Sequence, residues 1–357
     1  MKIALISPLP PYRGGIAQFG KMLLSALEKE NCDVTGINYS HLYPGFLFPG
    51  KTQYEEGSNR SEGILHSFQP FSWRKTRQAI SKMKPDLIIS QWWHPFFAPC
   101  LTAVNPGGIK SVAICHNIKP HESFPLAGAF SRRFFNKQDF LAVHSQRAED
   151  QAAATGRKVI RLFHPIYDQY VGTGLAREKA RKKLGLKPNQ KALLFFGLVR
   201  EYKGLDILIE ACNLLPEEYR VIAAGENYTD NDFKSPRLLW ENSFIPDSDV
   251  GTWFNAADIV VLPYRRASQS GIAQIALAFR KPLVVTDRGG LAETVNPGRT
   301  GIVADRATPE SLAEAILKCS ALALTITGKE ITTERITLKA SEFSWASYTH
   351  KLLETIS

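Results

Sequence analysis

Short apolar runs alternate with longer amphipathic stretches along the whole chain. The apolar runs are continuous and rich in Ile, Val, Leu and Phe, which is typical of parallel strands covered on both faces. We predict strands at residues 2–7, 33–38, 86–90, 111–115 and 140–144 in the first half, and at 192–196, 220–224, 238–240, 258–262, 283–286 and 301–303 in the second.

The amphipathic stretches predict helices between these strands. Residues 16–29 follow Gly14-Gly15 and carry apolar side chains at helical spacing, and residues 204–215 repeat that arrangement. A chain that alternates β and α elements forms a doubly wound α/β fold with a parallel sheet. Because the pattern occurs twice, we predict two Rossmann-like domains.

The length of 357 residues also fits two domains. The best linker candidate is the stretch 164–176, which contains Pro and Gly and lacks periodicity. We therefore place one domain at 1–165 and a second at 166–339, followed by an amphipathic helix at 340–357. Residues 41–75 form a long irregular segment, and such a segment in a compact domain is usually functional or disordered; its many aromatics argue against simple disorder.

Composition narrows the setting of the protein. The five cysteines are scattered and form no CxxC pair, so they indicate neither a zinc cluster nor a disulfide framework, and they fit a reducing compartment. The N-terminus lacks the pattern of a signal peptide, and no run of 18 apolar residues is present. We expect a cytoplasmic protein.

The positive charge is unevenly distributed. Residues 1–165 carry 20 basic and 11 acidic side chains, whereas residues 166–357 carry 24 and 23. An excess in one half attracts an anionic membrane surface, a nucleic acid or a pyrophosphate-linked acceptor, and it also serves solubility alone. No motif of a nucleic-acid-binding fold is present, so we expect no nucleic acid partner.

Candidate chemistry gathers where predicted strands end. Gly14 and Gly15 precede a helix, and backbone N–H groups at a helix start attract anions. Gly197, Arg200 and Lys203 follow a strand of the second domain, where two cations suit a pyrophosphate. The alternatives are a tight turn and a solvated loop.

Other strand ends carry polar groups as well. Ser270 and Gly271 open a helix and offer a hydroxyl and N–H donors to a phosphate, although Ser270 also fits a plain N-cap. His116 ends one first-domain strand, and Trp93 and His94 follow another. The histidines lack metal-ligand spacing, and Asp230-Asn231-Asp232 reads as a plain turn, so no metal is expected.

Together these segments resemble the GT-B glycosyltransferases, and specifically retaining family 4. The resemblance rests on SPLPPYRGGIAQF, the strand ending in His116, FFGLVREYKGLDILIEA, AADIVVLPY, QSGIAQIALAFRKPLVVTDRGGLAETV and FSWASYTHKL, in that order. It covers nearly the whole chain. It implies two Rossmann-like domains facing a central cleft, with the acceptor on the first, the nucleotide sugar on the second and the last helix packed back on the first.

The resemblance also implies roles for single residues. Gly15, with Gly14 beside it, matches the glycine that faces the donor phosphates, His116 the histidine near the transferred sugar, and Lys203 the lysine on the pyrophosphate. The segment around Ile245 matches the one that reads the base. We add as donor-binding candidates Gly197, Gln269, Ser270, Gly271 and Gln274, and as acceptor-binding candidates Arg13, Trp93 and His94.

The sequence departs from the family at three positions. Leu198 stands where the family usually has an arginine after the turn glycine, and Arg200, two residues further on, is the candidate to replace that arginine. Ala267 and Ile275 stand where the family carries two glutamates. Because the second glutamate holds the ribose hydroxyls in the family, the adjacent Gln274 becomes a candidate for that task. These departures identify a variant branch of the family.

We therefore expect a metal-independent, retaining hexosyltransferase that needs no cofactor. It would move sugar from a nucleotide diphosphate sugar, with uridine as the favoured base, to a glycan or lipid-linked acceptor in cell-surface polysaccharide synthesis. The basic first domain would contact the anionic inner face of the plasma membrane. Two alternatives stay open at this point: a sugar-nucleotide 2-epimerase, and a catalytically inactive sugar-nucleotide-binding protein.

Overall fold

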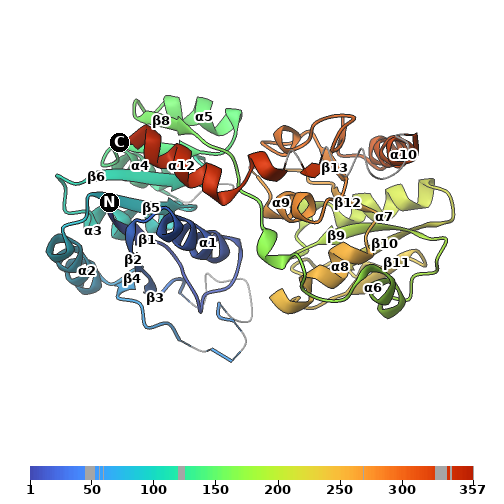
Figure 1. Cartoon of the computed structure of the whole chain (residues 1–357), viewed down its shortest axis with the longest axis horizontal. Coiled ribbons are helices and arrows are strands. Elements are labelled where there is room, and N and C mark those ends of the chain that lie inside the picture. Colours follow the sequence, from blue (N-terminus) through green and yellow to red (C-terminus); the bar gives the residue numbers. More distant parts are fainter. Residues whose placement is uncertain are drawn as a thin grey trace. The chain divides into compact units, whose positions relative to one another are not determined.

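The computed structural model divides the chain into two compact units. The first comprises Met1–Phe163 together with Trp345–Ser357, and the second comprises His164–Ser344. The structure describes residues 1–44, 53–55, 57–58, 60–119, 125–267, 269–325, 336–337 and 340–356. Part of the predicted irregular segment 41–75 therefore lies outside the described residues. Figure 1 shows that each unit is a sheet with helices on its faces.

The first unit is built on a six-stranded sheet in which all neighbouring strands are parallel. Its strand order is β2-β1-β5-β6-β7-β8. These strands are β1 (Lys2–Ile6), β2 (Asp33–Ile37), β5 (Leu87–Trp92), β6 (Lys110–Cys115), β7 (Phe140–Val143) and β8 (Lys158–Arg161). A small parallel pair, β3 (Tyr39–His41) and β4 (Leu65–His66), stands beside them.

Helices connect these strands and cover the sheet. They are α1 (Gly15–Lys29), α2 (Pro70–Met83), α3 (Ala98–Val104), α4 (Ala127–Phe135), α5 (Gln146–Ala153) and the final α12 (Trp345–Ile356), with a short 3-10 turn η2 (Pro95–Phe97). The apolar stripe of α1 (Phe19, Leu23, Leu27) is buried against the strands, which is why this segment forms a helix here.

The second unit repeats the plan with the order β11-β10-β9-β12-β13-β14, again all parallel. Its strands are β9 (Lys191–Phe196), β10 (Tyr219–Ala224), β11 (Leu238–Glu241), β12 (Ile259–Leu262), β13 (Leu283–Thr286) and β14 (Gly301–Ala304). Its helices are α6 (Arg177–Lys183), α7 (Leu205–Leu214), α8 (Val250–Ala256), α9 (Gly271–Ala278) and α10 (Pro309–Thr325), with 3-10 turns η3 (Asp168–Tyr170), η4 (Glu201–Lys203), η5 (Asp247–Asp249) and η6 (Ala292–Thr294).

The doubly wound prediction is confirmed, and every predicted strand is present within a residue or two. The prediction missed β8, which lies at the sheet edge with only Ile160 fully buried, so its sequence lacks a continuous apolar run. It also missed the very short β3 and β4. In the described parts of the chain, no helix combines the length and apolar character needed to span a bilayer.

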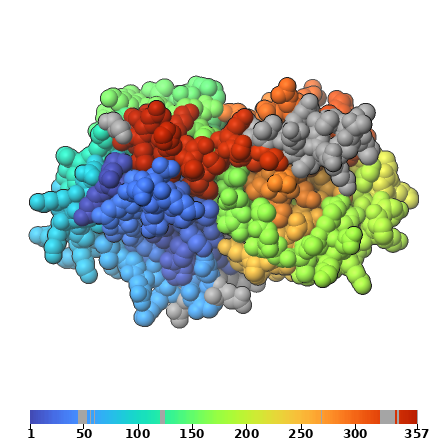
Figure 2. Space-filling view, viewed as in Figure 1, coloured from blue at the N-terminus to red at the C-terminus, as the bar shows by residue number. Residues whose placement is uncertain are grey.

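The last helix belongs to the first unit although it follows the second in sequence. Trp345, Tyr348 and Leu352 of α12 are buried in one cluster with Phe19 and Leu23 of α1. Figure 2 shows the red side chains of α12 lying against the blue ones of α1. The Tyr348 hydroxyl lies 3.0 Å from His144 Nε2, which adds a polar link to this packing.

Candidate functional site

The second sheet has a topological switch point between β9 and β12. From there the chain continues outward in opposite directions, through β10 and β11 on one side and β13 and β14 on the other. In open α/β sheets, ligands bind outside the carboxyl ends of the strands at such a point. Gly197 follows β9 there, and Pro263-Tyr264 follow β12.

Side chains from three elements converge on this point. A Cβ placed on Gly197 would lie 3.2 Å from Lys203 Nζ and 3.5 Å from Ile272 Cδ1. Lys203 Nζ also lies 5.8 Å from the centre of the Tyr264 ring. The turn after β9, the ammonium of η4, the end of β12 and the start of α9 therefore form one cluster, and Gly197 leaves room for the ammonium.

Glycines and an ion pair set the path of the chain around Lys203. Gly204 ends η4 at φ 70°, and a Cβ there would lie 2.3 Å from the carbonyl oxygen of Pro263. The Arg265 N–H donates to the Tyr202 carbonyl at 2.7 Å, and the Arg265 guanidinium pairs with Asp206 at 2.5 Å. These contacts tie η4 and α7 to the loop after β12, so Lys203 has little freedom to move away.

The cluster is electropositive. Burial, together with the smaller effect of the neighbouring Arg200 charge, lowers the pKa of Lys203 to about 8. The Arg200 guanidinium lies 5.7 Å from the centre of the Tyr228 ring. Arg200 is half-buried, and among the described residues no carboxylate forms an ion pair with Lys203. A half-buried ammonium gains most from an anionic ligand that restores its lost solvation.

The start of α9 adds polar groups to the same place. Ser270 is buried and its side chain makes no capping bond with the helix; instead its Oγ shares a 3.3 Å hydrogen bond with the Tyr264 hydroxyl. Gly271 packs against the ring of Tyr167, and the half-buried Gln269 precedes Ser270. Gln274 in the first turns of α9 is 1% exposed, and its Oε1 has no hydrogen-bond partner among the residues that the structure describes.

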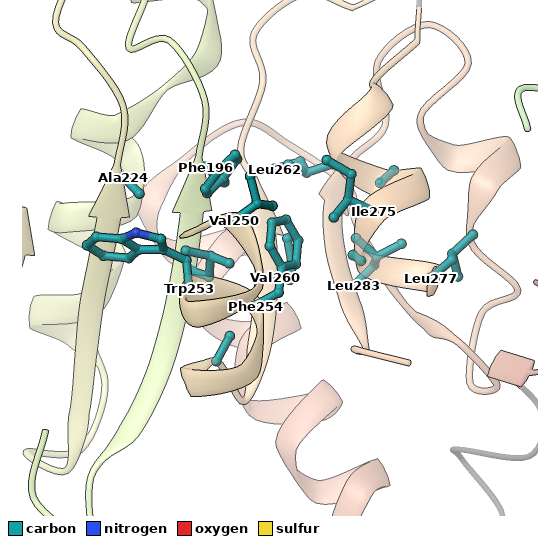
Figure 3. Packing of buried hydrophobic residues seen from close by; sticks show 14 of the residues in the cluster. Phe196, Ala224, Val250, Trp253, Phe254, Val260, Leu262, Ile275, Leu277 and Leu283 are labelled. Carbon is teal, nitrogen blue, oxygen red and sulfur yellow. The ribbon is translucent and has the colours of Figure 1, made fainter. Parts of the chain in front are cut away.

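Ala267 and Ile275, which stand where the resembled family carries glutamates, lie in apolar surroundings. Ile275 is buried in the core cluster that also contains Leu262 and Leu283, as Figure 3 shows. Ala267 packs against the same cluster. Ile245 is buried there too, whereas the adjacent Phe244 is 42% exposed. A carboxylate at position 275 would be buried among apolar side chains, which is costly, so the apolar Ile275 suits these surroundings.

The first sheet has its own switch point, between β1 and β5. Gly14 is the N-cap of α1 at φ 100°, and Gly15 opens the helix. Both glycines are exposed, and a Cβ on either would meet no atom within 4 Å. Arg13 is half-buried, and its N–H donates to the Gln53 carbonyl at 3.0 Å. The helix start is therefore open to an anion from solvent.

His116 lies at the end of β6, half-buried, with its ring edge-on to Phe19 at 4.8 Å. Its Nε2 lies 2.6 Å from Oε1 of Gln91, a residue of β5 that is fully buried. The sequence reasoning did not select Gln91. The available signal was an amide in a strand whose only other polar residue is Ser90, since a buried polar side chain must find partners.

The acceptor-binding candidates of the first unit lie side by side in sequence but differ in exposure. Trp93 is buried, and its indole N–H donates to the Tyr43 hydroxyl at 2.7 Å. His94 is half-buried, and its Nδ1 accepts from the Phe96 N–H at 3.2 Å, which caps η2. His94 is therefore the more accessible of the two, and Trp93 packs beneath the surface at the end of the strand.

Asp230 and Asp232 are exposed in the loop after β10, and Asp232 pairs with Lys234. Across the part of the chain that the structure describes, no three His, Cys, Asp or Glu side chains are grouped to hold a metal ion. The structure thus gathers the site candidates into two sets. Gly14, Gly15 and His116 belong to the first unit, and Lys203, Ser270 and Gln274 belong to the second.

Two family descriptions match the chain, one on each half. "Glycosyltransferase Family 4" matches residues 13–169, and "Glycosyl transferases group 1" matches residues 190–321. The second match contains both strands of its unit's switch point, and the first begins after β1 but contains Gly14, Gly15 and His116.

Several known proteins are similar to the chain. D-inositol 3-phosphate glycosyltransferase of Paenarthrobacter aurescens (strain TC1) is 28% identical over 172 residues, which are 44% of this chain and 42% of that protein. TuaC of Bacillus subtilis (strain 168), a glycosyltransferase named for teichuronic acid biosynthesis, is 27% identical over 89% of each chain. The structure of Anabaena HepE in complex with UDP-glucose has a TM-score of 0.72 at 16% identity and covers 100% of this chain and 99% of that one, which shows the shared fold.

Proposed function

We propose that this chain, a family 4 glycosyltransferase of the GT-B fold, moves a sugar from a nucleoside diphosphate donor held by its second unit. The cluster of Lys203 beside Gly197 and the start of α9 carries this proposal. Its half-buried ammonium lies at the switch point of the sheet, where this fold binds ligands. Since the chain is a glycosyltransferase, the 2-epimerase alternative is set aside.

The proposed chemistry is mainly electrostatic. The bond between the anomeric carbon and the diphosphate oxygen breaks, and a new bond to the acceptor oxygen forms on the same face of the sugar. The acceptor proton passes to the departing phosphate, and the nucleoside diphosphate leaves. Lys203 and Arg200 stabilise the negative charge that grows on the leaving group. Because two cations serve this need, we propose that no divalent metal takes part, and transfer in EDTA should match transfer without it.

Gln274 is proposed as the contact for the ribose hydroxyls. Its Oε1 is buried and unpartnered among the described residues, and such an orphaned acceptor gains a hydrogen bond from a ligand hydroxyl. An amide tolerates the apolar surroundings of Ile275 better than a carboxylate, because it brings no charge into them. Gln274→Leu should weaken the binding of a ribonucleoside diphosphate more than the binding of its 2'-deoxy analogue.

Gly15 and His116 of the first unit are proposed to contact a nucleotide sugar. The open helix start at Gly14-Gly15 suits a phosphate, and His116 offers an imidazole for the transferred sugar. Arg13 and His94 are proposed for the acceptor, with Trp93 supporting them. UDP-sugars are the favoured donors, because HepE, which shares the fold, binds UDP-glucose.

A panel of nucleotide sugars tests the donor proposal. UDP-, GDP- and ADP-sugars are added separately, and the unfolding temperature is measured, since a ligand that binds only the folded state stabilises it by mass action. We expect a rise with UDP-sugars and release of UDP from at least one when an acceptor glycan is present. No shift with any nucleotide sugar would contradict the proposal.

A lipid-linked acceptor is proposed because α2 offers a surface for an anionic membrane. Residues 70–84 carry five basic side chains and no acidic one. Phe71 at the start of α2 is 91% exposed, and Phe68 and Ile64 are also exposed nearby in sequence. Exposed aromatics beside cations are typical of helices that lie in a membrane interface.

Vesicle binding tests this surface. The protein should sediment with phosphatidylglycerol vesicles and hardly with phosphatidylcholine vesicles. Phe71→Ser should weaken partitioning about 10–100-fold, because a phenyl ring contributes about 1.5–3 kcal/mol when it leaves water. Leu214→Ser, which removes an exposed leucine of α7, is the matched control and should change little. Equal loss in both variants, or tighter binding to RNA than to vesicles, would overturn the membrane proposal.

A further inference from the structure

A hydrogen-bond network centred on Gln91 of β5 connects this strand to three other elements at the switch point of the first sheet. Gln91 of β5 is 0% exposed, and its Nε2 donates to Ser7 Oγ at 2.5 Å and to the Ile16 carbonyl at 3.2 Å. Its Oε1 lies 2.6 Å from His116 Nε2 at the end of β6. The network therefore links the end of β1, the first turn of α1 and the end of β6.

The donors and acceptors in this network have only one consistent arrangement. The Ile16 carbonyl accepts only, so the amide nitrogen of Gln91 must face it. Ser7 Oγ donates to the Pro8 carbonyl at 2.7 Å, which leaves it to accept from Gln91. The Gln91 oxygen then faces His116, and the Nε2–H of His116 must donate to it. A flipped amide would place its oxygen against the Ile16 carbonyl oxygen and against a Ser7 hydroxyl that already donates to Pro8.

Side chains and backbone of α1 pack tightly against this network and hold its groups in place. Gly20 of α1 lies directly over it, and a Cβ there would be 2.0 Å from Ser7 Oγ and 2.7 Å from Gln91 Nε2. Phe19 of the same helix holds the His116 ring edge-on at 4.8 Å. A buried amide with all its partners satisfied and no space to move is a rigid support for the group it contacts.

We infer that Gln91 is the positioning residue for His116. It fixes the imidazole with its proton on Nε2 and ties the ring to the helix start at Gly14-Gly15, through the Ile16 carbonyl. In the neutral ring Nδ1 is then the acceptor. The consequence for sugar transfer rests on the proposed function, whereas the state of the ring does not. The same amide thus sets the geometry of both first-unit groups proposed to meet the donor.

Nuclear magnetic resonance of the free protein tests the inference without a substrate. A ring N–H that donates to a buried oxygen exchanges slowly with water, and its resonance is assigned by its loss in His116→Gln. We expect this resonance in the wild type and its loss in Gln91→Met, which keeps the length of the side chain but neither hydrogen-bonding group. Gln138→Met is the matched control, because Gln138 is a buried glutamine of the same unit with its own backbone partner. A persisting resonance in Gln91→Met would overturn the inference.

Gln91→Glu provides a second measurement if Gln91→Met folds poorly. It keeps an oxygen against His116 Nε2 but adds a negative charge, so the imidazolium should persist to higher pH than in the wild type. An unchanged titration of the His116 ring in Gln91→Glu would also overturn the inference. If the ring responds in both variants but transfer with the selected donor keeps its rate and pH profile, the role of His116 in transfer fails and the positioning role stands.

Discussion

At the residue scale, Lys203 combines a structural cost with a proposed role in donor binding. Its pKa of about 8 lies below the unfolded value of 10.5 because burial disfavours the ammonium. Below pH 8 the folded state holds a charge that it solvates poorly. As the pH rises from 8 to 10.5, the unfolded chain binds the additional proton, so the contribution of Lys203 to stability increases with pH.

The lowered pKa predicts proton uptake when a diphosphate binds. The ligand's negative charge favours the ammonium, so near pH 8 the protein should take up part of a proton on binding UDP, and little at pH 6.5. Calorimetric titration in two buffers of different ionisation enthalpy measures this uptake. Lys203→Arg, which stays charged throughout, should bind without it. Equal uptake in the arginine variant would assign the proton to another group.

At the element scale, the turn from β9 into α7 depends on Gly204. We predict that Gly204→Ala lowers the free energy of unfolding by about 2–5 kcal/mol, from a positive φ and from overpacking against the Pro263 carbonyl. Gly185→Ala has nearly the same φ, 71°, but its Cβ would meet nothing within 4 Å, so it should cost only about 1–2 kcal/mol. Urea unfolding compares the two.

The two variants should also differ in function. Gly204→Ala displaces η4 and with it Lys203, so UDP binding should weaken, whereas Gly185→Ala should bind UDP like the wild type. If both variants bound UDP equally well, the position of η4 would not matter for the donor. The comparison separates strain in the backbone from the collision that is specific to position 204.

Elements with long apolar runs could be predicted from the sequence, and most of the candidate site residues lie at or after the ends of these elements. Gly197, Lys203, Ser270 and His116 follow strands that were predicted nearly to the residue. The rest depends on contacts between distant segments. Gln91 looks like any strand residue until Ser7 and His116 are placed beside it, and the orphaned Oε1 of Gln274 becomes visible only in the packed core.

At the scale of the whole molecule, the first unit is completed by the last helix of the chain. Tyr348 is fully buried, with ring contacts to Phe19 and Phe163 and a hydrogen bond to His144. The amphipathic pattern predicted this helix, and its place on the first unit followed only from the family resemblance. Local periodicity cannot tell which of two units offers the complementary apolar surface.

We predict that Tyr348→Ala destabilises the first unit alone. Loss of a fully buried aromatic costs about 3–5 kcal/mol, whereas Tyr348→Phe should cost about 0.5–1.5 kcal/mol for the hydrogen bond. Limited proteolysis during thermal unfolding should show earlier cleavage within residues 1–163 and unchanged cleavage within 164–344. Equal loss of protection in both units would mean that they unfold as one.

The donor site at Lys203 is tested most directly by the affinity of the protein for UDP, measured by calorimetric titration at pH 7. Lys203→Met should bind UDP about 10–100-fold more weakly than the wild type, because a charge-assisted hydrogen bond contributes about 1.5–3 kcal/mol. Lys187→Met is the control: Lys187 is exposed and precedes β9, at the opposite edge of the sheet, so its loss should leave the affinity unchanged. Binding of UDP by Lys203→Met as tight as that of the wild type would contradict the account.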